Sequence, residues 1–133
     1  MNGEKFLIDT TVWVNYLQGL DESVRDRLAV LVNEERAFTS EIVILEILRG
    51  AKSEKEYSML LEDFLALPQL PLDRKTWEIA WGNAFVLKQK GVTIPLVDLL
   101  ISALAIRYEC GLLHRDKHFS LLSKHLGIKA IHL

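Results

Sequence analysis

The chain has 133 residues, of which 50% are hydrophobic and 26% are charged, and its formal net charge is −2 at pH 7. This composition excludes an intrinsically disordered chain, and the charge excludes a protein that binds nucleic acid through bulk positive charge alone. The length suits one domain, spanning residues 1–133, with a sizeable core.

Cysteine content and hydropathy indicate the cellular compartment of the protein. The single cysteine, Cys110, cannot form an internal disulfide, and the first residues lack the basic and apolar regions of a secretory signal. The longest apolar stretch, residues 94–106, is interrupted by Asp98 and Ser102 and is too short to span a membrane. We therefore expect a cytoplasmic protein with no membrane partner.

Short apolar runs that predict strands alternate with helical patterns along the chain. Residues 6–8 read as a buried strand, and further strands are expected at residues 37–39, 111–114 and 128–131, with residues 68–72 as a candidate fifth at the edge. Strands separated by helices form right-handed βαβ units. We therefore predict an α/β fold, a three-layer α/β/α arrangement with a central parallel sheet of four to five short strands.

Three of the predicted helices have residues that identify their N-caps. Asp21 and Asp73 each precede a helical pattern, and Ser53 with Glu56 three residues later forms a capping box. The helix that follows Asp73 has an apolar face of large and small side chains: Trp77, Ala80, Trp81, Ala84 and Phe85.

Two aspartates follow predicted strands directly. Asp9 ends the first strand, and Asp116 comes just after the strand at residues 111–114. Ligands bind open α/β sheets at the carboxyl ends of parallel strands, so Asp9 is expected at the mouth of a site. Taken alone, Asp116 is better explained as the N-cap of its own helix.

Two more acidic residues lie on apolar helix faces. Glu46 is the only charge among residues 42–48, so it needs a compensating partner, either Arg49 on the same face or a cation, unless its carboxylate reaches solvent. Residues 96–106 are apolar at nine of eleven positions, and the exceptions, Asp98 and Ser102, are four apart and share one face. That narrow polar stripe indicates a supporting polar role for Ser102 beside Asp98, although Asp98 also favours the positive end of its own helix.

Together, the four carboxylates suggest a metal site. Asp9, Glu46, Asp98 and Asp116 are the oxygen ligands that a hard divalent cation requires. Without a cation they would repel one another and raise one another's pKa. Cysteine and histidine chemistry is less consistent with the sequence: Cys110 is interpreted as a small buried hydrophobe, and His114 and His118 as solvated or phosphate-facing.

Four segments carry a resemblance to a known family. They are residues 7–13 (LIDTTVW), 39–51 (TSEIVILEILRGA), 94–103 (IPLVDLLISA) and 112–119 (LLHRDKHF). In this order and spacing the chain resembles PIN-domain proteins, specifically the VapC-type toxins of bacterial and archaeal toxin-antitoxin pairs. The resemblance covers nearly the whole chain.

The resemblance implies a divalent-metal-dependent endoribonuclease of a type II toxin-antitoxin system. Asp9, Glu46, Asp98 and Asp116 match the family's acidic quartet, and Thr11 matches a small polar position that helps to order the site. Members usually bind Mg²⁺ or Mn²⁺, form homodimers and are inhibited by a cognate antitoxin whose tail lies near the site. Many relatives have a second aspartate shortly after the position of Asp116, where this chain has Lys117 and His118, which leaves the number of metal ions open.

Basic and aromatic residues beside these motifs admit two interpretations each. Arg49, Arg115 and Lys117 are candidates for contacts with the RNA backbone, or they offset the negative charge of the site and are solvated. Trp13, Tyr16 and Leu17 belong to the core, or they form part of an antitoxin groove or a dimer face.

Two other functions compete with a ribonuclease toxin. A phosphatase could use Asp9 as a nucleophile, but such enzymes usually have a second acid two residues later, where this chain has Thr11. The remaining alternative is a catalytically weak or inactive PIN-like α/β module that acts by binding a protein partner.

Overall fold

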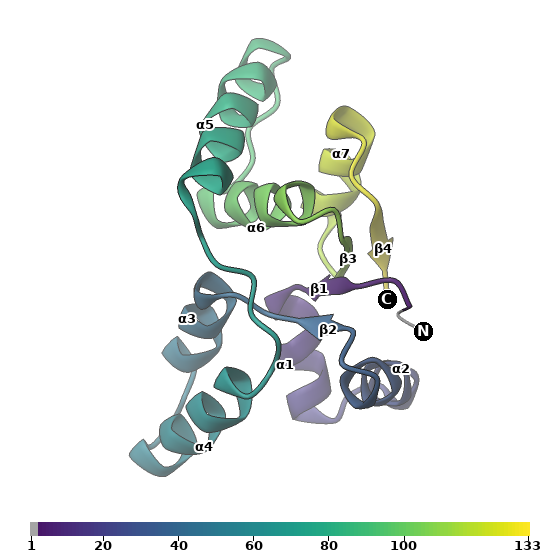
Figure 1. Ribbon diagram of the computed structural model, residues 1–133, viewed down its shortest axis with the longest axis vertical. Helices are drawn as coiled ribbons and strands as arrows, with labels where there is room; N and C mark the ends of the chain where they lie inside the picture. Colours follow the sequence, from purple (N-terminus) through teal and green to yellow (C-terminus); the bar gives the residue numbers. More distant parts are fainter. Residues whose placement is uncertain (1–2) are drawn as a thin grey trace.

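A four-stranded parallel sheet forms the centre of the protein in the computed structural model, which describes residues 3–133 (Figure 1). The strands are β1 (Phe6–Ile8), β2 (Ala37–Phe38), β3 (Gly111–His114) and β4 (Ala130–His132), in the order β2-β1-β3-β4. The predicted α/β fold with a central parallel sheet is therefore confirmed. Residues 68–72 add only a single bridge, between Thr39 and Gln69.

Helices connect the strands and cover both faces of the sheet (Figure 1). The described residues form α1 (Thr10–Gln18), α2 (Glu22–Asn33), α3 (Glu41–Arg49), α4 (Glu54–Leu65), α5 (Arg74–Gln89), α6 (Leu96–Arg107) and α7 (Lys117–Leu126). Helices α1 and α2 lie on one face, and α6 and α7 lie on the other, as right-handed crossovers require. None of these helices, all within residues 3–133, has the length and apolar character needed to cross a membrane.

The core lies between the sheet and its helices. Leu7 and Ile8 of β1, Leu112 of β3 and Ile101 and Leu104 of α6 are completely buried. Helix α6 is buried on nearly every side, and this explains why its sequence is apolar almost throughout.

The predicted helix caps are present. The Asp21 carboxylate accepts hydrogen bonds from the backbone N–H groups of Ser23 and Val24, and Ser53 Oγ accepts one from Glu56 N at 3.1 Å. The Asp73 carboxylate caps α5 and also accepts a hydrogen bond from Arg107 at the end of α6, at 2.8 Å. This ion pair holds the pKa of Asp73 well below its usual range and fixes α5 against α6.

The apolar face of α5 lies largely outside the core. Trp77, Trp81 and Phe85 are 45%, 55% and 66% exposed, whereas Ala80 and Leu87 are buried. In Figure 1, α5 projects from the body of the protein, and its main packing partner is α6. Periodicity correctly placed these aromatic residues on one face, but α6 is too narrow to cover that face.

Candidate active site

The four acidic residues predicted from the sequence line one pocket. This pocket has a volume of about 430 Å³ and lies where β1 and β3 end, beside α1, α3 and α6. Asp9, Glu46, Asp98 and Asp116 come from four separate segments of the chain and meet there. The parallel sheet brings the carboxyl ends of β1 and β3 to the same edge. Asp9 and Asp116 therefore lie at one site although they are far apart in the sequence.

Asp9 is the most buried of the four acids. It is 2% exposed, caps the N-terminus of α1 and accepts hydrogen bonds from the backbone N–H of Thr11, at 3.1 Å, and from the Thr11 hydroxyl. Burial raises the pKa of Asp9 to about 6, the Thr11 hydrogen bonds oppose this shift, and the charges of Asp98 and Glu46 add to it. A buried carboxylate of this kind is stabilised in its charged form by a nearby cation.

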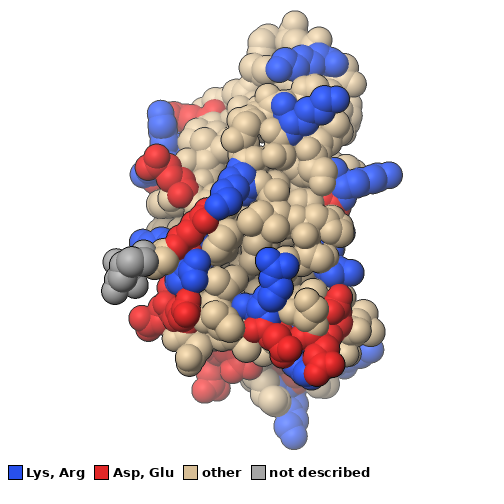
Figure 2. Space-filling view, turned by 90° about the vertical axis from the view of Figure 1, so that its right-hand side faces the viewer, with Lys and Arg blue, Asp and Glu red and all other residues tan. Residues whose placement is uncertain are grey.

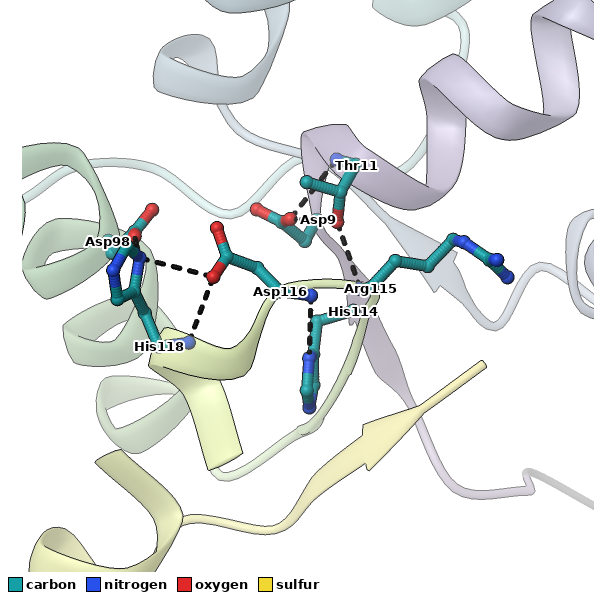
Figure 3. Close-up of polar contacts among 7 residues, drawn as sticks. All are labelled: Asp9, Thr11, Asp98, His114, Arg115, Asp116 and His118. Atoms are coloured by element: carbon teal, nitrogen blue, oxygen red, sulfur yellow. Dashed lines mark hydrogen bonds and ion pairs between the residues drawn. The ribbon is translucent and has the colours of Figure 1, made fainter. Parts of the chain in front are cut away.

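Thr11 joins the two strand ends that carry the aspartates. Its hydroxyl oxygen accepts a hydrogen bond from the backbone N–H of Arg115 at 3.0 Å while its proton is donated to Asp9 (Figure 3). A second bond, from Asp9 N to Leu113 O at 2.9 Å, runs between the same segments. Thr11 therefore fixes the β3–α7 turn, which carries Asp116, relative to Asp9.

Glu46 is held by a threonine and not by an arginine. Thr10 Oγ1 donates a hydrogen bond to Glu46 Oε1 at 2.6 Å, across the gap between α1 and α3. Arg49 is exposed, and the ion pair with Glu46 that the sequence allowed is absent from the described residues. Glu46 is only partly buried, so contact with solvent and binding of a cation are the alternatives that remain for its charge.

Asp98 and Asp116 share a histidine. His118 Nδ1 lies 3.0 Å from Asp98 Oδ2 and 3.1 Å from Asp116 Oδ1, and Asp116 also accepts a hydrogen bond from His118 N at 2.9 Å (Figure 3). Burial and the Asp116 charge raise the pKa of Asp98, and His118 opposes that shift. His118 is thus not simply a solvated residue: its side chain is 33% exposed, but its ring belongs to the carboxylate cluster.

His114 is also not a solvated residue. It is 1% exposed, its ring packs 5.4 Å from the Phe119 ring, and its Nδ1 accepts a hydrogen bond from Asp116 N at 3.2 Å. Burial, with a smaller contribution from His132, lowers the pKa of His114. A neutral His114 can accept that hydrogen bond, and in this way it supports the turn that presents Asp116.

Ser102 lies away from the pocket lining. It is completely buried, and its hydroxyl donates a hydrogen bond to Leu99 O in its own helix at 2.8 Å. A serine that bonds back to its helix needs no outside partner. The polar stripe on α6 therefore presents Asp98 to the site, while Ser102 is satisfied locally.

Of the three basic residues predicted near the site, Arg115 lines the pocket. Its guanidinium donates a hydrogen bond to Leu133 O at 2.6 Å and lies 3.8 Å from the Asp21 carboxylate. Arg49 and Lys117 are exposed on the neighbouring surface. On the face drawn in Figure 2, Lys and Arg alternate with Asp and Glu and form no single basic surface.

Sequence reasoning missed five residues that line the pocket. They are Thr10, Val14, Asn15, Gln18 and Leu20, all in α1 or just after it. Helical spacing was the available signal for three of them, because Val14, Asn15 and Gln18 lie three, four and seven positions after Thr11 and share its face.

The side chains present fit a divalent cation. Ligand atoms of Asp98, Asp116 and His118 lie within 4.8 Å of one another, and Asp9 and Glu46 open onto the same pocket. Carboxylate oxygens suit hard cations such as Mg²⁺ and Mn²⁺. The charge of a cation would also offset the burial and the mutual repulsion that together raise the pKa values of Asp9 and Asp98.

Comparison with protein families identifies this architecture. Residues 6–124 match the PIN domain. The chain belongs to the PIN-domain family. Among curated proteins it is similar to the ribonuclease VapC11 of Mycobacterium tuberculosis H37Rv, with 30% identity over 93% of this chain and 96% of the relative.

Solved structures share the fold. VapBC2 from Rickettsia felis, crystallised with a DNA fragment from its promoter, matches with a TM-score of 0.82 and 22% identity, covering 96% of this chain and 98% of that one. DNA-bound VapBC from Salmonella typhimurium matches with a TM-score of 0.83 and 21% identity, covering 98% of both chains. These similarities confirm the PIN-like fold inferred from the four sequence segments.

The raised pKa of Asp9 predicts how metal-free stability depends on pH. Its pKa is about 6 in the folded protein against an ordinary value of 3.8, so the folded state binds the proton more tightly than the unfolded chain does. The contribution of Asp9 to stability is therefore complete below the ordinary pKa and is lost as the pH rises through 6.

We expect Asp9→Asn to stabilise the metal-free protein near neutral pH. The pKa difference corresponds to at most about 3 kcal/mol, and the gain should vanish at about pH 4. Urea unfolding of both proteins with a chelator, at about pH 4 and about pH 7, measures it. An Asp9→Asn variant that is less stable than the wild type at neutral pH would contradict the account.

Proposed function

We propose that this protein is a metal-dependent endoribonuclease and the toxin of a type II toxin-antitoxin system. The observation that carries the proposal is the meeting of Asp9, Glu46, Asp98 and Asp116 in one pocket of a PIN fold. The similarity to a named VapC ribonuclease supports it. The protein would act in the cytoplasm, where its RNA substrate is present.

Mg²⁺ or Mn²⁺ is the cofactor that this donor set favours, with Asp9, Asp98, Asp116 and Glu46 as the residues that would hold it. Such an ion supplies activation of a water molecule and neutralisation of negative charge on the phosphate. The protein's own contribution is orientation: Thr11 fixes Asp9, Thr10 fixes Glu46, and His118 holds Asp98 and Asp116 together.

RNA would be held through its backbone beside the acidic site. Arg115 is the one predicted phosphate contact that lines the pocket, while Arg49 and Lys117 flank it on exposed positions. The nearly neutral surface provides little general attraction, so affinity depends on these few contacts and on the metal.

Replacement of Asp98 tests the catalytic site. We expect Asp98→Asn to lower kcat/KM for RNA cleavage by at least about 100-fold, because even changes outside the first ligand shell cost about 10- to 100-fold. Ser102→Ala, one turn along the same helix and away from the pocket, should retain activity. A gel assay with a mixed RNA pool and Mn²⁺ measures both variants. An Asp98→Asn enzyme as active as the wild type would contradict the proposal and favour a protein-binding module.

An antitoxin would bind on the other side of α1. Tyr16 and Leu17 line an apolar groove with Val32, Phe64 and Leu67, with a volume of about 200 Å³. Trp13 forms the floor of this groove, because it is 3% exposed and packs edge-on against Phe64 at 5.0 Å. The solved neighbours are VapBC complexes, which contain a partner protein.

Leu17 is the residue to test in this groove, because it is 47% exposed and can be changed without disturbing the core. Leu17→Glu should weaken the complex with an antitoxin by at least about 10-fold, since a charge would be buried in an apolar contact. The assay is co-purification after co-expression with the products of the flanking reading frames. Undiminished co-purification of Leu17→Glu would show that the antitoxin binds elsewhere. Met59→Glu, on the exposed side of α4, is the control and should co-purify like the wild type.

A homodimer would form through the aromatic face of α5. Trp77, Trp81, Leu96 and Leu100 surround an apolar hollow of about 410 Å³ between α5 and α6. Contiguous exposed apolar surface of this kind often marks an association site. A second copy of the chain could bury the same face by two-fold symmetry.

Trp81→Glu should convert the dimer to a monomer. Trp81 is 55% exposed in the single chain, so the substitution removes a contact between copies without opening the core. Light scattering after size-exclusion chromatography measures the mass of the wild type and the variant. A wild type that is monomeric, or a variant that stays dimeric, would contradict the assignment.

A further inference from the structure

A ring nitrogen of His118 lies against two of the four carboxylates (Figure 3). His118 Nδ1 is 3.0 Å from Asp98 Oδ2 and 3.1 Å from Asp116 Oδ1, and the ligand atoms of the three residues all lie within 4.8 Å of one another. The side chains of His118, Asp98 and Asp116 are 33%, 15% and 29% exposed, so an ion from solvent can reach this cluster.

Protons alone do not satisfy the contacts of this nitrogen. Nδ1 of an imidazole carries at most one proton, so it can donate one well-aligned hydrogen bond. Nδ1 and Asp98 Oδ2 have the geometry of a hydrogen bond, whereas the contact with Asp116 Oδ1 is only a close approach. Asp116 Oδ1 already accepts a hydrogen bond from the backbone N–H of His118 at 2.9 Å, so the ring is not needed to hold it.

The spacing of the donor atoms suits a shared ion. Two donors that occupy neighbouring positions of an octahedral ion, each about 2.1 Å from it, lie about 3 Å apart. Both distances from His118 Nδ1 to the carboxylate oxygens have this value. Binding of a metal ion displaces the proton of a ligating imidazole, which makes the nitrogen lone pair available to the ion.

The backbone fixes His118 in position before any ion binds. His118 is the second residue of α7, whose N-cap is Asp116, and the next residue, Phe119, is completely buried. Asp98 lies in the first turn of α6, which is buried on nearly every side. The nitrogen and the two carboxylates therefore stand on the first turns of two packed helices, and rigid elements of this kind hold metal ligands with precision.

We propose that His118 is a metal ligand, together with Asp98 and Asp116, and that it makes the site select a first-row transition ion over Mg²⁺. Mg²⁺ takes oxygen ligands, whereas imidazole nitrogen suits transition ions such as Fe²⁺ and Ni²⁺. This inference rests on the proposed metal-dependent function and narrows its choice of ion. Mn²⁺ is then a better cofactor than Mg²⁺ for this chain.

His118→Asn separates ligation from hydrogen bonding. Asparagine keeps an N–H donor near the position of Nδ1 but has no ring nitrogen with a free lone pair. Calorimetry of protein without a histidine tag gives the Kd for Mg²⁺ and for Ni²⁺. We expect the ratio of the Mg²⁺ Kd to the Ni²⁺ Kd to fall at least about 10-fold in His118→Asn. The ratio should be unchanged in His125→Asn, the matched control seven residues later in α7.

Pulsed electron paramagnetic resonance of bound Mn²⁺ detects a ligating nitrogen independently of activity. We expect coupling to a ring nitrogen in the wild type and in His125→Asn, and its loss in His118→Asn.

Three results would overturn the role of His118 as a ligand and leave a metal-dependent ribonuclease standing. The first is Mn²⁺ bound to the wild type without nitrogen coupling while RNA is cut. The second is coupling that persists in His118→Asn, and the third is an equal loss of affinity for Mg²⁺ and Ni²⁺ in that variant, which is the result of a positioning role alone. A wild type that binds none of the three ions and cuts no RNA would overturn the proposed function and the ligand together.

Discussion

The burial of the Asp9 carboxylate at the end of β1 is the constraint on which the site depends. A carboxylate that is 2% exposed needs hydrogen bonds and a compensating charge. Thr11 provides the hydrogen bonds and, by accepting one from Arg115 N, connects Asp9 to the turn that carries Asp116. Burial, with smaller contributions from the charges of Asp98 and Glu46, nevertheless raises the pKa of Asp9. In the proposed function, a divalent cation would offset the negative charge of Asp9, and the buried carboxylate at the strand end would become a metal ligand.

Helix α1 lies between the acidic pocket and the apolar groove that we propose for the antitoxin. One face carries Thr10, Thr11 and Asn15 into the acidic pocket, and the opposite face carries Tyr16 and Leu17 into the apolar groove. Both faces belong to one rigid helix, fixed at its start by Asp9 and at its end by Gly19. A partner bound in the groove would therefore lie one helix diameter from the site and could reach it around the helix end.

Much of the fold and the acidic site could be predicted from the sequence, because both depend on local patterns. The apolar run of α6, the N-caps at Asp21 and Asp73 and the strand-terminal position of Asp9 are each determined by neighbouring residues. What could not be predicted depends on packing between distant segments. Periodicity placed Trp81 on an apolar face but could not show that α6 leaves it uncovered, and only the meeting of α6 with α7 brings His118 between Asp98 and Asp116.

The central claim is that four carboxylates from separate segments hold one catalytic metal centre. The most direct measurement is anomalous X-ray diffraction at the manganese edge from crystals soaked in Mn²⁺. The account predicts an anomalous peak inside the pocket, within bonding distance of oxygens from Asp98, Asp116 and Asp9. A fully soaked crystal with no peak in the pocket, or with Mn²⁺ bound only elsewhere on the protein, would contradict it.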